Sequence, residues 1–128
     1  MDAGTFRDLT VYKKAFALAM DIFEISKSFP KEERYSLTDQ VRKSSRSVCS
    51  CIGEAYRKRQ YPAFFVNKSS DADMENTETR VWLDFALACN YMDKEKRDAL
   101  DIKSEEVGKL LNHMIENPEK YNRKQNVN

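Results

Sequence analysis

Hydrophobic positions recur every three or four residues along most of the chain, which is the periodicity of amphipathic helices. Within residues 9–28 two such stripes run side by side. One stripe contains Val11, Ala15, Leu18, Ile22, Ile25 and Phe29, and the other contains Tyr12, Phe16, Ala19 and Phe23. A helix over this segment is apolar over a wide arc. We therefore expect it to contact more than one neighbouring helix, or a neighbouring subunit as well.

A second helix is predicted over residues 36–59. Its hydrophobic stripe advances in steps of four and three residues and consists of Leu37, Val41, Ser44, Val48, Cys51 and Ala55. Several of these side chains are small, so another helix can approach closely. Ser36 is predicted to be the N-cap, with Asp39 three residues further on at the helix end that favours negative charge.

Two more helices are predicted over residues 62–92 and 94–116. The first of them has large apolar residues at both ends, but its middle, residues 67–80, is almost entirely polar. The second ends before Pro118, which cannot continue a helix. Its inward-facing positions are predicted to be Leu100, Val107, Leu110, Leu111, Met114 and Ile115.

Four helices with short connections predict an all-α fold, an antiparallel up-down four-helix bundle. A chain of 128 residues supports one hydrophobic core, so we expect a single domain over residues 1–128. Its core is expected over about residues 6–117. Residues 118–128 show no pattern and are expected to be a frayed tail.

The amino-acid composition excludes several classes of protein. Three glycines and three prolines are too few for the turns of a β-sandwich. The longest uncharged apolar run, residues 15–20, is too short to cross a membrane, and the amino end does not resemble a secretory signal. We therefore expect a cytoplasmic protein with no membrane partner. Three cysteines, an odd number, are expected to be reduced rather than paired in disulfides or metal sites.

The formal net charge of +1 excludes a globally basic nucleic-acid binder, but the charge is unevenly distributed. Residues 34–60 contain seven basic and two acidic side chains, a net charge of +5. Residues 61–92 contain two basic and five acidic side chains, a net charge of −3. A basic second helix therefore lies next to an acidic third helix in the sequence.

The basic side chains of the second helix form the candidate nucleic-acid site. At about 100° per residue, Arg42, Arg46 and Arg57 fall on one side of the helix, opposite its hydrophobic stripe. They form either a solvated face or a ridge that contacts phosphates, for which the forked donors of arginine are well suited. The candidate residues are Arg42, Lys43, Arg46, Arg57, Lys58 and Arg59.

Asp71, Glu75 and Glu78 share one stripe of the third helix with large aromatic residues. An unpaired buried charge costs several kcal/mol, so these carboxylates are expected to meet cations on another helix or subunit. The second helix is the expected donor of those cations. The alternative is that the carboxylates are free for acid–base chemistry.

No metal site, cofactor or catalytic residue is predicted. Di-iron bundles require Glu-x-x-His on two helices, whereas Glu75 and Glu78 form Glu-x-x-Glu and the single histidine, His113, lies on another helix. The sequence contains no glycine-rich phosphate loop and no nucleophile–base motif. An enzyme is therefore not expected.

Four segments match short sequence signatures. Residues 29–33 (FPKEE) are similar to F-P-x-x-E. Residues 37–48 and 52–55 are similar to L-T-x-Q-h-R-R-S/A-x-x-S-I and N-I-A/G-E-G/A, except that Cys51 replaces the usual Asn. Residues 78–83 (ETRVWL) are similar to E-T-x-h-x-L. Together these segments resemble a bacterial four-helix-bundle family, the 23S rRNA intervening-sequence proteins or S23-like ribosomal proteins, and the resemblance extends over about residues 6–116.

The resemblance implies a homopentamer and no established catalytic activity. The family name refers to genes inside intervening sequences of 23S rRNA, which is an association of location. A related branch, the accessory proteins of diversity-generating retroelements, binds nucleic acid and a reverse transcriptase through a basic pentamer surface. Those relatives are markedly basic, whereas this chain is nearly neutral.

Two hypotheses follow. The first is a non-enzymatic oligomeric bundle that binds RNA or another nucleic acid weakly through its second helix. The alternative is a homo-oligomeric scaffold for protein interactions that does not bind nucleic acid, in which the same arginines pair with the acidic stripe.

Overall fold

The computed structural model describes residues 4–122, and every regular element in this part of the chain is helical. Four long helices account for most of it: α1 (Thr10–Ser26), α2 (Leu37–Arg57), α3 (Pro62–Ala88) and α4 (Lys94–Glu116). Short 3-10 turns at Phe6–Asp8, Lys31–Glu33 and Pro118–Lys120 flank or connect them. Among the described residues, no helix is both long and apolar enough to span a bilayer.

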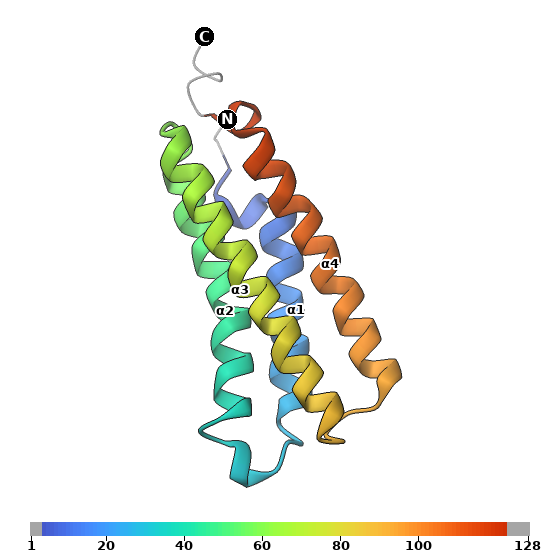
Figure 1. Cartoon of the computed structure of the whole chain (residues 1–128). Helices are drawn as coiled ribbons and strands as arrows, with labels where there is room; N and C mark the ends of the chain where they lie inside the picture. The colour runs from blue at the N-terminus through green and yellow to red at the C-terminus, as the bar shows by residue number, and fades with distance from the viewer. Residues whose placement is uncertain (1–3, 123–128) are drawn as a thin grey trace.

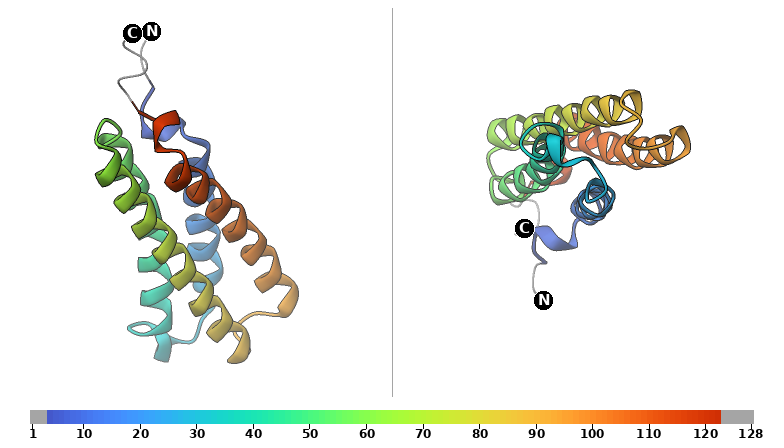
Figure 2. Two further views of the ribbon diagram at one scale, coloured as in Figure 1. Left: turned by 45° about the horizontal axis from the view of Figure 1, so that its top comes forward. Right: turned by 90° about the horizontal axis from the view of Figure 1, so that it is seen from below.

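The four helices run alternately up and down, which confirms the predicted four-helix bundle (Figure 1). In the view along the bundle, α1 and α3 lie on opposite sides with α2 and α4 between them (Figure 2, right). The connection between α2 and α3 lies at the same end as the start of α1 and the end of α4. At this end the hydroxyl of Tyr56 donates a hydrogen bond to the carbonyl of Gly4 at 3.1 Å.

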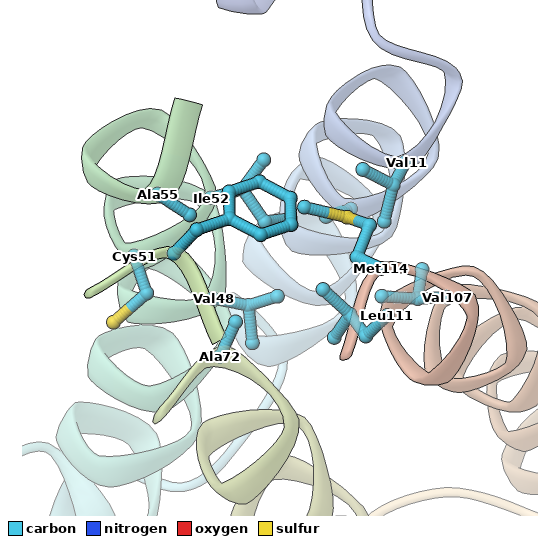
Figure 3. Packing of buried hydrophobic residues seen from close by; sticks show 11 residues of the cluster. Val11, Val48, Cys51, Ile52, Ala55, Ala72, Val107, Leu111 and Met114 are labelled. Carbon is cyan, nitrogen blue, oxygen red and sulfur yellow. The ribbon is translucent and has the colours of Figure 1, made fainter. Parts of the chain in front are cut away.

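The core contains two hydrophobic clusters stacked along the bundle axis. The cluster nearer the chain ends includes Ile52 from α2 and Met114 from α4, which point toward one another in Figure 3. The other cluster includes Ile22, Leu83 and Leu100. Both clusters take residues from all four helices, so each helix is held at two levels.

Buried hydrogen bonds link α3 to its neighbours within its polar middle. The hydroxyls of Ser44 and Thr79 are 2.9 Å apart and join α2 to α3. Asn76 donates to the carbonyl of Ser104 at 3.0 Å and accepts from the Ser104 hydroxyl at 2.9 Å, joining α3 to α4. The polar middle of α3 is therefore partly an internal layer of satisfied polar groups and not only a solvated face.

The carboxylate of Glu33, and not the hydroxyl of Ser36, caps the start of α2. Ser36 occupies the predicted N-cap position, but its hydroxyl donates to Glu33 Oε1 at 2.6 Å. The backbone N–H of Leu37 donates to the same oxygen at 3.2 Å. Glu33, three positions earlier, therefore caps the helix in place of the Ser36 side chain.

α3 ends at Ala88, four residues before the predicted boundary at Met92. Asn90 adopts a left-handed conformation with φ of 64°, and the N–H of Tyr91 returns to the carbonyl of Ala86 at 2.8 Å. This is the Schellman arrangement that terminates many helices. Asn is one of the few residues besides Gly that adopts it readily.

Residues 118–122 differ from the frayed tail expected from the sequence. Pro118–Lys120 forms a 3-10 turn, after which the Tyr121 ring stacks on Phe65 with 5.4 Å between ring centroids. The Tyr121 hydroxyl is also 2.8 Å from Nδ1 of His113. The ordered part of the chain thus continues past α4. Residues 123–128, the rest of the predicted tail, lie outside the described residues.

Candidate nucleic-acid interface

The six candidate basic residues form two separate groups along α2 and just beyond its end. Arg42, Lys43 and Arg46 lie near the middle of the helix, and Arg57, Lys58 and Arg59 lie at its carboxyl end. Eleven residues separate Arg46 from Arg57, which corresponds to about 16 Å along the helix axis. The two groups therefore have different neighbours.

The middle group faces α1. Arg42 Nε donates to the hydroxyl of Ser26 at 2.7 Å, and its guanidinium lies 4.8 Å from the ring centroid of Phe23. The guanidinium of Arg46 lies over the same ring at 5.5 Å. These two arginines help to hold α2 against α1, whereas the side chain of Lys43 is exposed and lies 3.8 Å from Asp39.

Aromatic rings surround the carboxyl-terminal group. The guanidinium of Arg59 lies 3.6 Å from the ring centroid of Tyr56 and donates to the Tyr56 carbonyl at 2.9 Å. Lys58 Nζ lies 5.6 Å from the ring centroid of Tyr61 and 5.4 Å from that of Phe64. Tyr61 and Phe64 are 49% and 59% exposed, so both rings are accessible from solvent. We call this group, comprising Arg57, Lys58, Arg59, Tyr61 and Phe64, the basic–aromatic turn.

The charges of the basic–aromatic turn have no carboxylate partner in the described part of the chain. Among residues 4–122, no carboxylate forms an ion pair with Arg57, Lys58 or Arg59. The nearby Glu54 is instead paired with Lys68, with 2.8 Å between Oε1 and Nζ. The carboxyl end of a helix favours cations, so this position also stabilises the three charges before any ligand arrives.

Within residues 4–122, the acidic stripe of α3 forms no ion pair with the cations of α2. Asp71 lies 3.6 Å from Lys68, and Glu78 Oε2 accepts a hydrogen bond from Trp82 Nε1 at 3.1 Å. The ion pair that joins the two helices, Lys68–Glu54, has its cation on α3 and its carboxylate on α2. The sequence led us to expect cations on α2 and carboxylates on α3, so this pair has the opposite arrangement of charges.

Glu75 is the member of the acidic stripe with the least favourable surroundings. It is half-buried, and no cation pairs with it among the described residues. Burial, followed by the neighbouring carboxylates of Glu78 and Asp71, raises the pKa of Glu75. A cation from outside the chain would relieve this repulsion.

Tyr56, Tyr61 and Phe64 are absent from the site predicted from the sequence. A signal for them was present, because aromatic residues stand on both sides of the basic run at positions 56, 61 and 64. Their contacts with Lys58 and Arg59 depend on the tight connection between α2 and α3. Helical periodicity alone does not describe such a connection.

The residues that carry the family resemblance have structural contacts. Glu33 accepts a hydrogen bond from the hydroxyl of Tyr91 at 2.8 Å besides capping α2. Ser44 and Thr79, from two different signature segments, form the buried pair between α2 and α3. Cys51, at the position where the resemblance implies Asn, packs at the edge of the first cluster, and burial raises its pKa (Figure 3). These residues maintain the bundle.

In the part of the chain that the structure describes, no three potential metal-ligating side chains lie close enough together to hold an ion. His113 contacts Tyr121, as described above, and it forms no hydrogen bond with Glu75 or Glu78 among the described residues.

Comparisons with known proteins agree with this architecture. A protein with unknown function from the S23 ribosomal protein family of Bacteroides thetaiotaomicron VPI-5482, solved by crystallography at 1.70 Å resolution, is similar with a TM-score of 0.75. The two chains are 29% identical, and the match covers 83% of this chain and 95% of that chain. None of the curated proteins searched matches this chain. The family of 23S rRNA-intervening sequence proteins matches residues 7–113, which is most of the chain. The resemblance noted in the sequence is thereby confirmed, and the chain belongs to the 23S rRNA-intervening sequence protein family.

Proposed function

We propose that this protein is a non-enzymatic accessory protein that binds RNA through its basic–aromatic turn. The observation that carries the proposal is the presence of three cations without carboxylate partners in the described residues, next to two half-exposed aromatic rings. Arg57, Lys58 and Arg59 would contact phosphates. Tyr61 and Phe64 would stack on unpaired bases, as aromatic residues do in many proteins that bind single strands.

The proposal assigns unequal roles to the six predicted residues. Arg42 and Arg46 already contact Ser26 and Phe23, so they contribute less to RNA binding than the turn does. Lys43 is exposed and adds a phosphate contact of intermediate strength. Because phosphate contacts carry no sequence information, binding is expected to be weak, dependent on salt and poorly specific for sequence.

Fluorescence anisotropy with a stem–loop RNA at about 50 mM salt tests this proposal. The charge-reversed variant Arg57→Glu/Lys58→Glu/Arg59→Glu is expected to lose binding. A matched control reverses three exposed lysines that have no ion-pair partner among the described residues, Lys31, Lys96 and Lys109. Absence of binding by the native chain, or equal binding by the two variants, would refute the proposal.

A second candidate function is a homo-oligomeric scaffold without RNA binding. Large apolar side chains exposed on both α1 and α3 favour it, because monomeric proteins rarely expose extended apolar patches. The family resemblance makes a pentamer the expected assembly. Native mass spectrometry would test it, and a mass of a single chain at micromolar concentration would reject it.

A further inference from the structure

A pocket of about 330 Å³ lies at the connection between α1 and α2, at the end of the bundle opposite the basic–aromatic turn (Figure 1). Pockets that hold small molecules have volumes of about 300–1,000 Å³, so this one is large enough for a small ligand. Among the described residues that line it, none is acidic and four are cationic: Lys27, Lys31, Arg34 and Arg42. A pocket lined by cations alone favours an anionic occupant.

Three of these four cations, Lys31, Arg34 and Arg42, form no ion pair within residues 4–122. The fourth, Lys27, lies 3.2 Å from Glu24, and both of these side chains are exposed. Exposed ion pairs contribute little and exchange readily with solvent. The positive charge of the pocket is therefore available to a ligand.

The carboxylates that are close to the pocket in the sequence have other partners. Asp39, in the first turn of α2, lies 3.8 Å from Lys43. Glu33 accepts hydrogen bonds from the Ser36 hydroxyl and from the backbone N–H of Leu37. Neither carboxylate lines the pocket, so neither offsets its cations at close range.

Arg42 is held in place with part of its guanidinium unused. Its Nε donates to the hydroxyl of Ser26 at 2.7 Å, and that hydroxyl donates in turn to the carbonyl of Phe23 at 3.0 Å. The terminal nitrogens of Arg42 form no hydrogen bond or ion pair among the described residues. A fixed guanidinium with free terminal donors is well suited to the oxygens of a phosphoryl group.

Thr38 is an independent indication of a ligand. Its side chain lines the pocket and the residue is only 8% exposed, yet its hydroxyl forms no hydrogen bond within residues 4–122. Most buried hydroxyls have a partner. Thr38 is also the second residue of α2, where the positive end of the helix dipole favours an anion. An anionic oxygen in the pocket would accept a hydrogen bond from this hydroxyl.

We propose that this pocket binds a small phosphomonoester, with the phosphoryl group among the three unpaired cations and the Thr38 hydroxyl. A phosphomonoester has a charge of about −1.5 to −2 at pH 7 and three acceptor oxygens, which match this set of donors. The organic part of the ligand would lie against Phe29 and Pro30, the apolar residues of the lining. The site is separate from the basic–aromatic turn, for which the proposed ligand is the phosphodiester backbone of RNA.

Isothermal titration calorimetry at about pH 7 and constant ionic strength tests the proposal, with phenyl phosphate as the probe and its methyl ester, a phosphodiester, as the comparison. The native chain is expected to bind phenyl phosphate with a Kd of about 1 mM or tighter, and the diester at least fivefold more weakly. Lys31→Gln/Arg34→Gln is expected to weaken binding of phenyl phosphate tenfold or more. The matched control Lys13→Gln/Lys109→Gln removes two exposed cations elsewhere and is expected to bind like the native chain.

Thr38→Val provides a second test, because it keeps the shape of the side chain and removes only the hydroxyl. It is expected to weaken binding of phenyl phosphate about tenfold, through the loss of a hydrogen bond to a charged group. The midpoint of urea unfolding is not expected to fall, since the hydroxyl has no partner in the described chain. Native affinity in both Thr38→Val and Lys31→Gln/Arg34→Gln would overturn the proposal.

The remaining outcomes separate this pocket from general attraction of anions and from RNA binding. No binding of phenyl phosphate by the native chain at about 10 mM, equal affinity for the diester, or an equal loss in the Lys13→Gln/Lys109→Gln control would each overturn the proposal. The variant Arg57→Glu/Lys58→Glu/Arg59→Glu is expected to bind phenyl phosphate like the native chain. Loss of phenyl phosphate binding in that variant would place the ligand at the basic–aromatic turn and overturn the assignment to this pocket.

Discussion

Glu33 connects three segments at the end of the bundle opposite the basic–aromatic turn. Its carboxylate accepts hydrogen bonds from Ser36, from the backbone N–H of Leu37 and from the hydroxyl of Tyr91. Hydrogen bonds to the charged form, first from Ser36 and then from Tyr91, lower the pKa of Glu33. The same contact raises the pKa of Tyr91 to about 12. The acidic residue of the F-P-x-x-E signature is thus a capping and joining residue.

This contact predicts a pH-dependent contribution to stability. Because the pKa of Glu33 is lower in the folded chain than its ordinary value of 4.5, its stabilisation is fully present above pH 4.5 and is lost as the pH falls through the folded pKa. Urea unfolding of the native chain and of Glu33→Gln, measured at pH 7 and at pH 3, checks this. We expect the native chain to be more stable at pH 7 and the difference to shrink at pH 3. A difference that is equal at both pH values would contradict the assignment.

The aromatic rings of the basic–aromatic turn predict a contribution to RNA binding that does not depend on charge. Tyr61→Ala and Phe64→Ala each remove a half-exposed ring, and loss of one stacked base costs about 1–3 kcal/mol. Binding of a single-stranded RNA, measured by anisotropy, is expected to weaken accordingly, while Tyr35→Ala, which removes another exposed ring, has no effect. Equal affinities for all three variants would exclude stacking at this turn.

At the scale of the elements, the polar layer between the two hydrophobic clusters fixes how α3 packs on α2 and α4. Asn76 and Ser104 satisfy each other through two hydrogen bonds in a buried position. Removing one partner leaves the other unsatisfied, which costs more than the hydrogen bond itself contributes.

Replacing this pair therefore predicts non-additive effects on stability. Asn76→Ala is expected to lower the free energy of unfolding by about 2–3 kcal/mol and Ser104→Ala by about 1–2 kcal/mol. The double variant should lose less than the sum, because the second substitution removes a group that the first has already left unpaired. Urea unfolding measures all three variants, with the exposed Ser50→Ala as control. Strictly additive losses would mean that the two side chains do not act as a pair.

Helical periodicity predicted the four helices, and the short connections between them predicted the up-down topology. Helical periodicity did not predict the end of α3, because the left-handed turn uses Asn90 and no glycine marks it. It also did not distinguish buried from solvated polar residues in the middle of α3, because Asn76 and Thr79 are buried only through partners on other helices.

The candidate site, like the fold, could be predicted from the sequence only in part. The six cations could be read from the sequence, since a basic run and a helical spacing are local features. The division of these cations into two groups could not be predicted from the sequence. It depends on contacts with Phe23 of α1 and with the aromatic rings that follow α2. The reversed ion pair Lys68–Glu54 likewise depends on the rotation of α3 relative to α2.

At the scale of the whole molecule, a net charge of +1 conceals a separation of charge between neighbouring surfaces. The basic–aromatic turn concentrates cations at one end of the bundle, and Glu75 and Glu78 of α3 have no cation partner among the described residues. Such an arrangement suits both local contact with a polyanion and self-association. It does not suit tight binding of RNA over the whole surface.

The salt dependence of RNA affinity tests the central claim most directly. For a single strand, the logarithm of the association constant falls with the logarithm of salt concentration by about 0.7 for each phosphate neutralised. Replacing Arg57, Lys58 and Arg59 with Gln is therefore expected to make this slope shallower by about 2. The control with Gln at Lys31, Lys96 and Lys109 should keep the native slope. Native slopes in both variants would contradict RNA binding at the basic–aromatic turn.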